Sequence, residues 1–119
     1  MFHFPPYNYE EDYAVIREEW CTLFDKYHVD MVMSGHTHYY MRSKPILNEQ
    51  VVEHVSQGIV YVISVGIPGN HENMPDEDYA EVRDGSGWLY QHMEIKDNIL
   101  IYKSPDIQGN IIDSLKIIK

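Results

Sequence analysis

The chain has 119 residues, a hydrophobic share of 44%, an aromatic share of 13% and a formal net charge of −10. This apolar content argues against disorder, and the length gives room for one domain with a modest core, which we place at 1–119. The acidic balance and the lack of a basic stripe argue against nucleic acid as a partner. No apolar run reaches the ~18–20 residues of a membrane span, so we expect no membrane association.

The first elements predicted along the chain are a strand, a helix and a second strand. Residues Met1 to Phe4 form a short apolar segment that Pro5 and Pro6 end. Between 10 and 27, apolar residues recur at steps of three and four, which predicts one face of a helix. These residues are Tyr13, Ile16, Trp20, Leu23, Phe24 and Tyr27. The run at 29–33 predicts a buried strand, and a helix between two strands predicts a parallel, right-handed crossover.

The remaining segments predict mostly strands. Residues 51–55 and 59–65 are strand candidates, and the second is so continuously apolar that we expect it to be buried. Residues 66–87 predict a long irregular segment. Three further segments are separated by turns and predict an antiparallel meander. They are 88–95, 99–103 and 111–118. The predicted fold class is therefore α/β (α+β), a β-α-β crossover followed by a mostly antiparallel β meander.

Histidines follow both strands of the predicted crossover. We expect Gly35 to end the second strand sharply at positive φ and to place His36 and His38 at its carboxyl end, where open α/β sheets bind ligands. His3 lies at the end of the first apolar segment. Neutral imidazoles are suitable ligands for zinc, iron and manganese. These positions predict a metal site that includes all three rings. The alternative, which the residues alone leave open, is that His36 and His38 are ordinary polar loop residues.

Two stretches resemble the last two metal motifs of the calcineurin-like metallophosphoesterase superfamily. They are residues 3–7, His-Phe-Pro-Pro-Tyr, and residues 29–42, which contain Gly-His-Thr-His at 35–38. The extension with Tyr40, Arg42 and Pro45 is most similar to the purple acid phosphatase branch. Most of the chain is covered by this resemblance, but only as the carboxy-terminal part of the catalytic domain.

A looser resemblance extends further along the chain. Residues 58–66 and the Gly-Asn-His-Glu segment at 69–72 are similar to a strand and a Gly-Asn-x-Glu loop of that branch, and 87–90 resembles the start of its closing hairpins. The letters at 69–72 also spell the family's catalytic motif, but their position after His38 favours a glycine-rich rim loop. The acidic segment 72–78 matches no calcium loop in its spacing, so a solvated loop is preferred there to a Ca²⁺ site.

The resemblance implies a partial metallophosphoesterase β-sandwich and a metal-dependent hydrolysis of phosphate monoesters at a dinuclear centre of iron, zinc or manganese. It implies that His3 and His36 ligate one ion and that His38 ligates the other. It also places Arg42 near the substrate phosphate, where a guanidinium binds in a bidentate manner. A structural ion pair is the alternative for Arg42. Family members are often secreted or extracytoplasmic, but the sequence does not fix the compartment.

Three motifs of the family are absent before His3: Asp-x-His, Gly-Asp-x-x-Asp and the catalytic Gly-Asn-His-Glu. By resemblance they supply the carboxylate that bridges the metals and the histidine that assists the leaving group. We therefore expect a missing amino-terminal half as a partner, weak or partial metal occupancy, and no turnover by this chain alone. An inactive fragment or scaffold and a single-metal binding module are the alternatives. An uncovered apolar edge also predicts self-association.

Other residues receive simpler interpretations. The single cysteine, Cys21, falls within the helical pattern, and we expect a buried, inert thiol. His28, His54 and His92 lack a partner pattern and are expected at the surface. Three tyrosines either line a pocket or pack in the core. They are Tyr7, Tyr39 and Tyr40.

Overall fold

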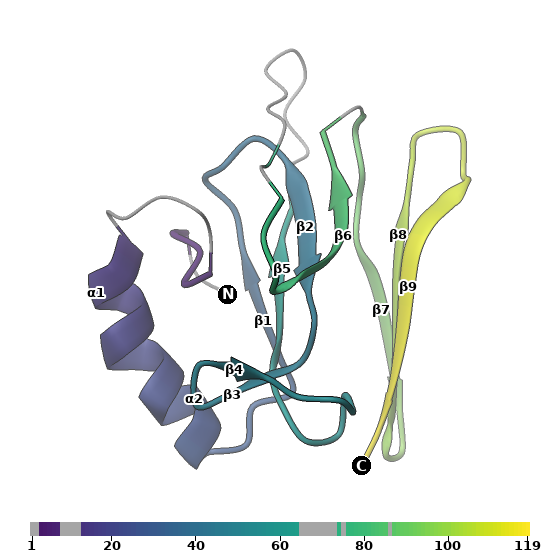
Figure 1. Ribbon diagram of the computed structural model, residues 1–119. Coiled ribbons are helices and arrows are strands. Elements are labelled where there is room, and N and C mark those ends of the chain that lie inside the picture. Colours follow the sequence, from purple (N-terminus) through teal and green to yellow (C-terminus); the bar gives the residue numbers. More distant parts are fainter. Residues whose placement is uncertain (1–2, 8–12, 65–73, 75, 86) are drawn as a thin grey trace.

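The computed structural model describes residues 3–7, 13–64, 74, 76–85 and 87–119. Its elements form three layers: a helix, a four-stranded sheet and a three-stranded sheet (Figure 1). This mixed α/β arrangement with a partial β-sandwich confirms the predicted fold class. No helix within the described ranges is long and apolar enough to cross a membrane.

The helix contains a π-helical turn in its middle. Its consecutive parts are α1 (Ala14–Ile16), the π-helical η2 (Arg17–Cys21) and α2 (Thr22–Lys26). A π turn holds more residues than an α turn and so rotates the next turn of the helix about its axis. Cys21 at the end of this turn is buried, while Trp20 and Leu23 are each 42% exposed. The predicted helix is confirmed in its described part. The apolar face that the spacing predicts is only partly buried.

The four-stranded sheet has the order β1-β5-β2-β6. Its strands are β1 (Met31–Ser34), β2 (Tyr40–Ser43), β5 (Val60–Ile63) and β6 (Ala80–Asp84). β1 pairs with β5 in parallel, whereas β2 pairs with both β5 and β6 in antiparallel fashion. The parallel partner of β1 is therefore β5, which lies much later in the chain than the predicted partner at 1–4.

The strand predicted at Met1–Phe4 is wrong in its described part. His3 and Phe4 form bends, and Met1 and Phe2 lie outside the described residues. A proline follows directly, and proline restricts the residue before it and offers no N–H for a ladder. The His3 carbonyl nevertheless accepts a hydrogen bond of 3.1 Å from the Gly35 N–H, which ties this segment to the end of β1.

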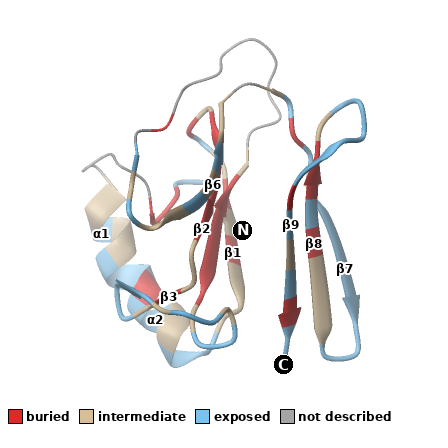
Figure 2. Ribbon diagram, turned by 45° about the vertical axis from the view of Figure 1, so that its right-hand side comes forward, coloured by how far each residue is buried: buried red, intermediate tan, exposed pale blue. Residues whose placement is uncertain are grey.

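β5 is buried on both of its faces, as its continuous apolar sequence predicts. Tyr61 packs with Cys21 in a cluster on the helix side, while Val60 and Val62 pack with Tyr102 between the two sheets. Figure 2 shows that the neighbouring strand β2 is buried as well. Val65, the last residue of the predicted strand, lies outside the described residues.

Two predictions between the strands need correction. The strand expected at 51–55 is reduced to β4 (Gln50–Val51), which forms a short hairpin with β3 (Ile46–Leu47). The irregular segment expected at 66–87 contains β6, which pairs with β2. β6 alternates between half-buried and exposed residues, and its charged residues hide this weak strand pattern in the sequence.

The predicted antiparallel meander is confirmed. Its strands are β7 (His92–Lys96), β8 (Ile99–Pro105) and β9 (Ile111–Ile118), with β8 in the middle. The first strand begins four residues later than predicted. Asp97 takes a φ of 54° in the turn between β7 and β8. The Asp106 carboxylate accepts hydrogen bonds from the N–H groups of Gln108 and Asn110 and so shapes the turn between β8 and β9.

Candidate metal centre

The loop after β1 turns sharply at His36. The Thr37 N–H donates to the Gly35 carbonyl over 3.0 Å, and His36 between them has a φ of 73°. This is a γ-turn with a positive central φ, a rare and strained conformation. The expectation that Gly35 takes positive φ is wrong, because the only described glycine with positive φ is Gly109. A histidine tolerates such a backbone better than most residues do.

The structure brings His3 and His36 into direct contact. The Nε2 atom of His3 lies 3.1 Å from the Nδ1 atom of His36, and the two rings meet edge to face. Two imidazole nitrogens that bind one tetrahedral zinc ion lie roughly 3.3 Å apart, given metal–nitrogen bonds of about 2.0–2.1 Å. The spacing of this pair therefore fits two ligands of a single ion. Both side chains are exposed, so an ion can reach them from solvent.

Two aromatic rings surround His36 beside this pair. The Phe4 ring centroid lies 4.5 Å from that of His36, and the Tyr13 ring meets the imidazole at 89° with centroids 5.5 Å apart. Phe4 and Tyr13 also contact each other. These contacts limit the orientations of the His36 ring. The sequence pattern did not assign Phe4 or Tyr13 to the site, although Phe4 lies next to His3 in the motif.

His38 lies two residues beyond His36 and is half-buried. Thr37 between them is buried, and its hydroxyl has no hydrogen-bond partner among the described residues. Within those residues, no group of three or more His, Cys, Asp or Glu side chains is gathered closely enough to hold an ion. The structure thus joins two of the three predicted imidazoles, and the role of His38 stays a prediction.

Arg42 takes part in a buried polar network between the two sheets. Its Nε and Nη2 atoms donate to the Asp113 carboxylate over 2.6 and 3.0 Å. The Tyr40 hydroxyl donates to the same carboxylate over 2.6 Å and lies 3.1 Å from the Tyr102 hydroxyl. The structural ion pair that the sequence left open is therefore present. Contact between Arg42 and a substrate stays a prediction.

The network has a clear electrostatic character. Burial lowers the pKa of Arg42, but hydrogen bonding and attraction to Asp113 outweigh it and raise that pKa overall. Burial raises the pKa of Tyr40 well above the usual value for tyrosine, and it also raises the pKa of Tyr102. The guanidinium therefore stays charged and both phenols stay neutral over the ordinary pH range. This arrangement links the two sheets through one buried ion pair.

The other residues singled out from the sequence either pack in the core or lie at the surface. Cys21 is buried as expected, and burial raises the pKa of its thiol to about 11, which keeps it protonated and unreactive. The three tyrosines at 7, 39 and 40 are all buried, and the three histidines at 28, 54 and 92 are exposed. The Gly-Asn-His-Glu segment at 69–72 lies outside the described residues.

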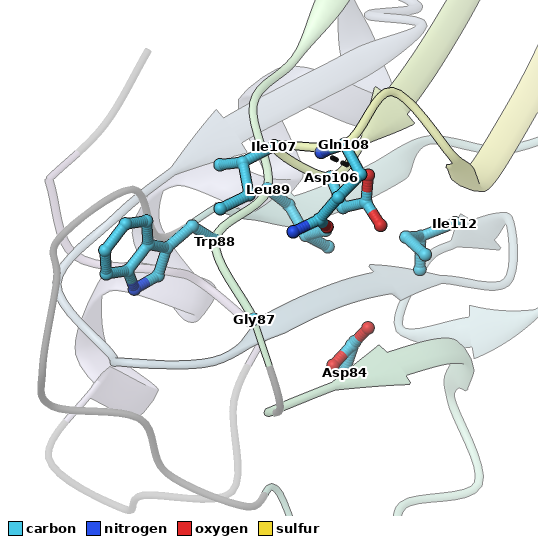
Figure 3. Close-up of a pocket in the computed structure, with 8 residues that line it drawn as sticks. All are labelled: Asp84, Gly87, Trp88, Leu89, Asp106, Ile107, Gln108 and Ile112. Carbon is cyan, nitrogen blue, oxygen red and sulfur yellow. Dashed lines mark hydrogen bonds between the residues drawn. The ribbon is translucent and has the colours of Figure 1, made fainter.

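A cavity of about 340 Å³ lies away from the histidines, between the end of β6 and the β8–β9 turn (Figure 3). Its lining comprises Asp84, Gly87, Trp88, Leu89, Asp106, Ile107, Gln108 and Ile112. None of the predicted site residues lines it. The Asp106 carboxylate, which faces this cavity, is already bonded to backbone and side-chain donors of its own turn. Those bonds lower the pKa of Asp106 and keep its charge engaged in the turn.

Comparisons with known proteins support the fold. Purple acid phosphatase PPD1 from seeds of yellow lupin (Lupinus luteus) superposes with a TM-score of 0.75 and 22% identity, over 98% of this chain and 24% of that chain. An uncharacterised protein of Mycobacterium tuberculosis, found in two strains, is 58% identical over 31 residues, which are 26% of this chain and 6% of that protein. No protein-family profile matches the chain.

These comparisons establish that the chain shares its fold with part of the lupin phosphatase. At 22% identity the likeness to the lupin phosphatase concerns the fold and not the activity. The chain spans about a quarter of that phosphatase and a smaller share of the mycobacterial protein. The activity of a complete phosphatase, its metals and its substrates are therefore matters for proposal.

Proposed function

We propose that this chain contributes part of a metal-dependent phosphoesterase of the purple acid phosphatase type, which hydrolyses phosphate monoesters. The observation that carries the proposal is the His3–His36 pair, whose ring nitrogens lie 3.1 Å apart beside the carboxyl end of β1. The metallophosphoesterase-like fold supports it independently. In this proposal the two histidines hold one ion, and His38 serves a second ion.

The residues of this chain have definite tasks in that reaction. A bound divalent or trivalent ion (iron, zinc or manganese) supplies local positive charge that attracts a phosphate ester to a protein with a formal net charge of −10. His3 and His36 bind that ion, while the rings of Phe4 and Tyr13 hold the His36 imidazole in place. Arg42 lies on β2, directly after the histidine loop, where its buried side chain is paired with Asp113, and its contact with a substrate stays a prediction.

One observation favours a second candidate, a metal-binding scaffold without turnover. The described residues offer no third ligand, whether histidine, cysteine, aspartate or glutamate, next to the two histidines. Two protein ligands are fewer than the three that catalytic zinc sites normally have. A chain of this kind binds metal weakly and needs further ligands from elsewhere before it can hydrolyse an ester.

The first experiment is a calorimetric titration of Zn²⁺ and of Mn²⁺ into the isolated chain. We expect binding weaker than micromolar, because only two imidazoles converge. The variant His36→Ala should abolish the signal, since it removes one of the two ligands. His54→Ala is the matched control, because His54 is exposed and lies on the loop after β4. Submicromolar binding, or equal loss in both variants, contradicts this description of the site.

A second measurement separates the two candidates. The chain is combined, in cis or in trans, with a segment that carries the Asp-x-His and Gly-Asp-x-x-Asp motifs, and hydrolysis of an aryl phosphate is followed. Turnover that depends on both His3 and His36 supports the phosphoesterase. Formation of a folded, metal-loaded complex without turnover supports the scaffold.

A further inference from the structure

β7 is an edge strand whose apolar residues are left uncovered. Among the described residues it pairs only with β8, and all five of its residues are exposed. Figure 2 shows it at the outer edge of its sheet with no strand beyond it. Residues directly opposite in an antiparallel pair share a face. Met93 lies opposite the buried Tyr102, and Ile95 lies opposite Leu100, which packs against the core.

Met93 and Ile95 therefore belong to the inner face of the sandwich, yet they are 46% and 72% exposed. The opposite sheet is also open on this side, because β1 is its edge strand. A cavity of about 610 Å³ separates the two edges and is lined by apolar residues of both sheets, among them Met31, Met33 and Met93. Exposed strand edges backed by apolar side chains favour pairing with another strand.

The outer face of β7 indicates which strand fits. It carries His92, Glu94 and Lys96, so an acidic and a basic residue lie two positions apart along the edge. When two copies of β7 pair in antiparallel fashion about a two-fold axis at Ile95, each Glu94 lies opposite Lys96 of the second copy. Opposite charges in directly facing positions stabilise such a pair. A two-fold axis at Glu94 would instead oppose two carboxylates.

We propose that two copies of this chain associate through β7, with Ile95 on the two-fold axis and Glu94 facing Lys96 across the interface. The association joins the two three-stranded sheets into one six-stranded sheet. It brings each Ile95 against its equivalent, and so covers the most exposed apolar side chain of the strand. This interface does not involve His3, His36 or His38, so it is independent of the proposed metal chemistry.

The test is sedimentation velocity on the 119-residue chain over a wide range of concentration. We expect a reversible dimer. Glu94→Lys alone, or Lys96→Glu alone, should raise its dissociation constant roughly tenfold, because two opposite-charge pairs become like-charge pairs. The double variant Glu94→Lys with Lys96→Glu should restore the original constant. Lys116→Glu, an exposed change on β9, is the matched control and should leave the constant unchanged.

Each other outcome overturns the proposal. The proposal is wrong if the chain stays monomeric throughout the concentration range. It is also wrong if neither single variant weakens the dimer, or if the double variant does not restore the original dissociation constant. Circular dichroism of each variant shows that the charge changes leave the fold intact. If the chain alone is monomeric but binds an added amino-terminal phosphoesterase segment at β7, that segment is the occupant and self-association is excluded.

Discussion

Replacing Asp113 with alanine should lower the free energy of unfolding by about 3–5 kcal/mol, because it leaves the Arg42 guanidinium buried without its partner. The side chains of Arg42 and Asp113 are only 11% and 4% exposed. Tyr40 loses its carboxylate acceptor in the same variant. Urea denaturation followed by tryptophan fluorescence measures the loss.

The matched control is Asp76→Ala, which removes another aspartate–arginine pair. The Oδ1 atom of Asp76 lies 2.8 Å from the Nη2 atom of Arg83, but the Asp76 side chain is 92% exposed. We therefore expect the free energy of unfolding to fall by only about 0–1 kcal/mol. The double variant Arg42→Met with Asp113→Leu should recover much of the stability, because neither charge is then left unpaired. Equal losses for Asp113→Ala and Asp76→Ala would show that burial of the pair has no energetic consequence.

Gly58→Ala should destabilise the protein by about 1–3 kcal/mol through a clash with the main chain. A Cβ atom at this position would lie 2.8 Å from both the nitrogen and the oxygen of Ile46. Those atoms cannot move easily, because they form a reciprocal pair of hydrogen bonds with Ile59. Thermal unfolding provides the measurement.

Gly87→Ala is the control for this effect. A Cβ atom at Gly87 meets nothing within 4 Å among the described residues, and the backbone there does not require glycine. We expect this variant to be neutral or to gain up to about 1 kcal/mol, because alanine restricts the unfolded chain. A Gly58→Ala protein that is as stable as Gly87→Ala would mean that the β3 backbone yields to the added methyl group.

The sequence predicted the parts of the fold that depend on local pattern. The continuous apolar run of β5, the hairpin spacing of β7 to β9 and the helical spacing after Tyr13 all correspond to observed elements. The pairing of strands was less accessible, because β5 rather than residues 1–4 lies parallel to β1. Such pairing depends on contacts between distant segments, which no local periodicity encodes.

The sequence indicated two residues of the candidate site, but it did not indicate the backbone conformation that positions them. The motifs indicated His3 and His36, and the structure places their ring nitrogens in contact. The glycine before the histidines was a reasonable choice for positive φ, yet His36 adopts it within the γ-turn. Arg42 illustrates a further limit: its partner Asp113 is 71 residues away in the chain, so no motif connects them.

The Arg42–Asp113 pair has a consequence for how the two sheets are aligned. A slide of the three-stranded sheet over the other by two residues of β9 would keep the same side chains facing inward, but it would carry Asp113 roughly 7 Å along the strand direction. Both charges would then be buried and separated, at a cost of several kcal/mol. Apolar contacts between the sheets, such as those of Tyr102 with Val60 and Val62, discriminate poorly against such a slide. The charged pair therefore selects one superposition of the layers.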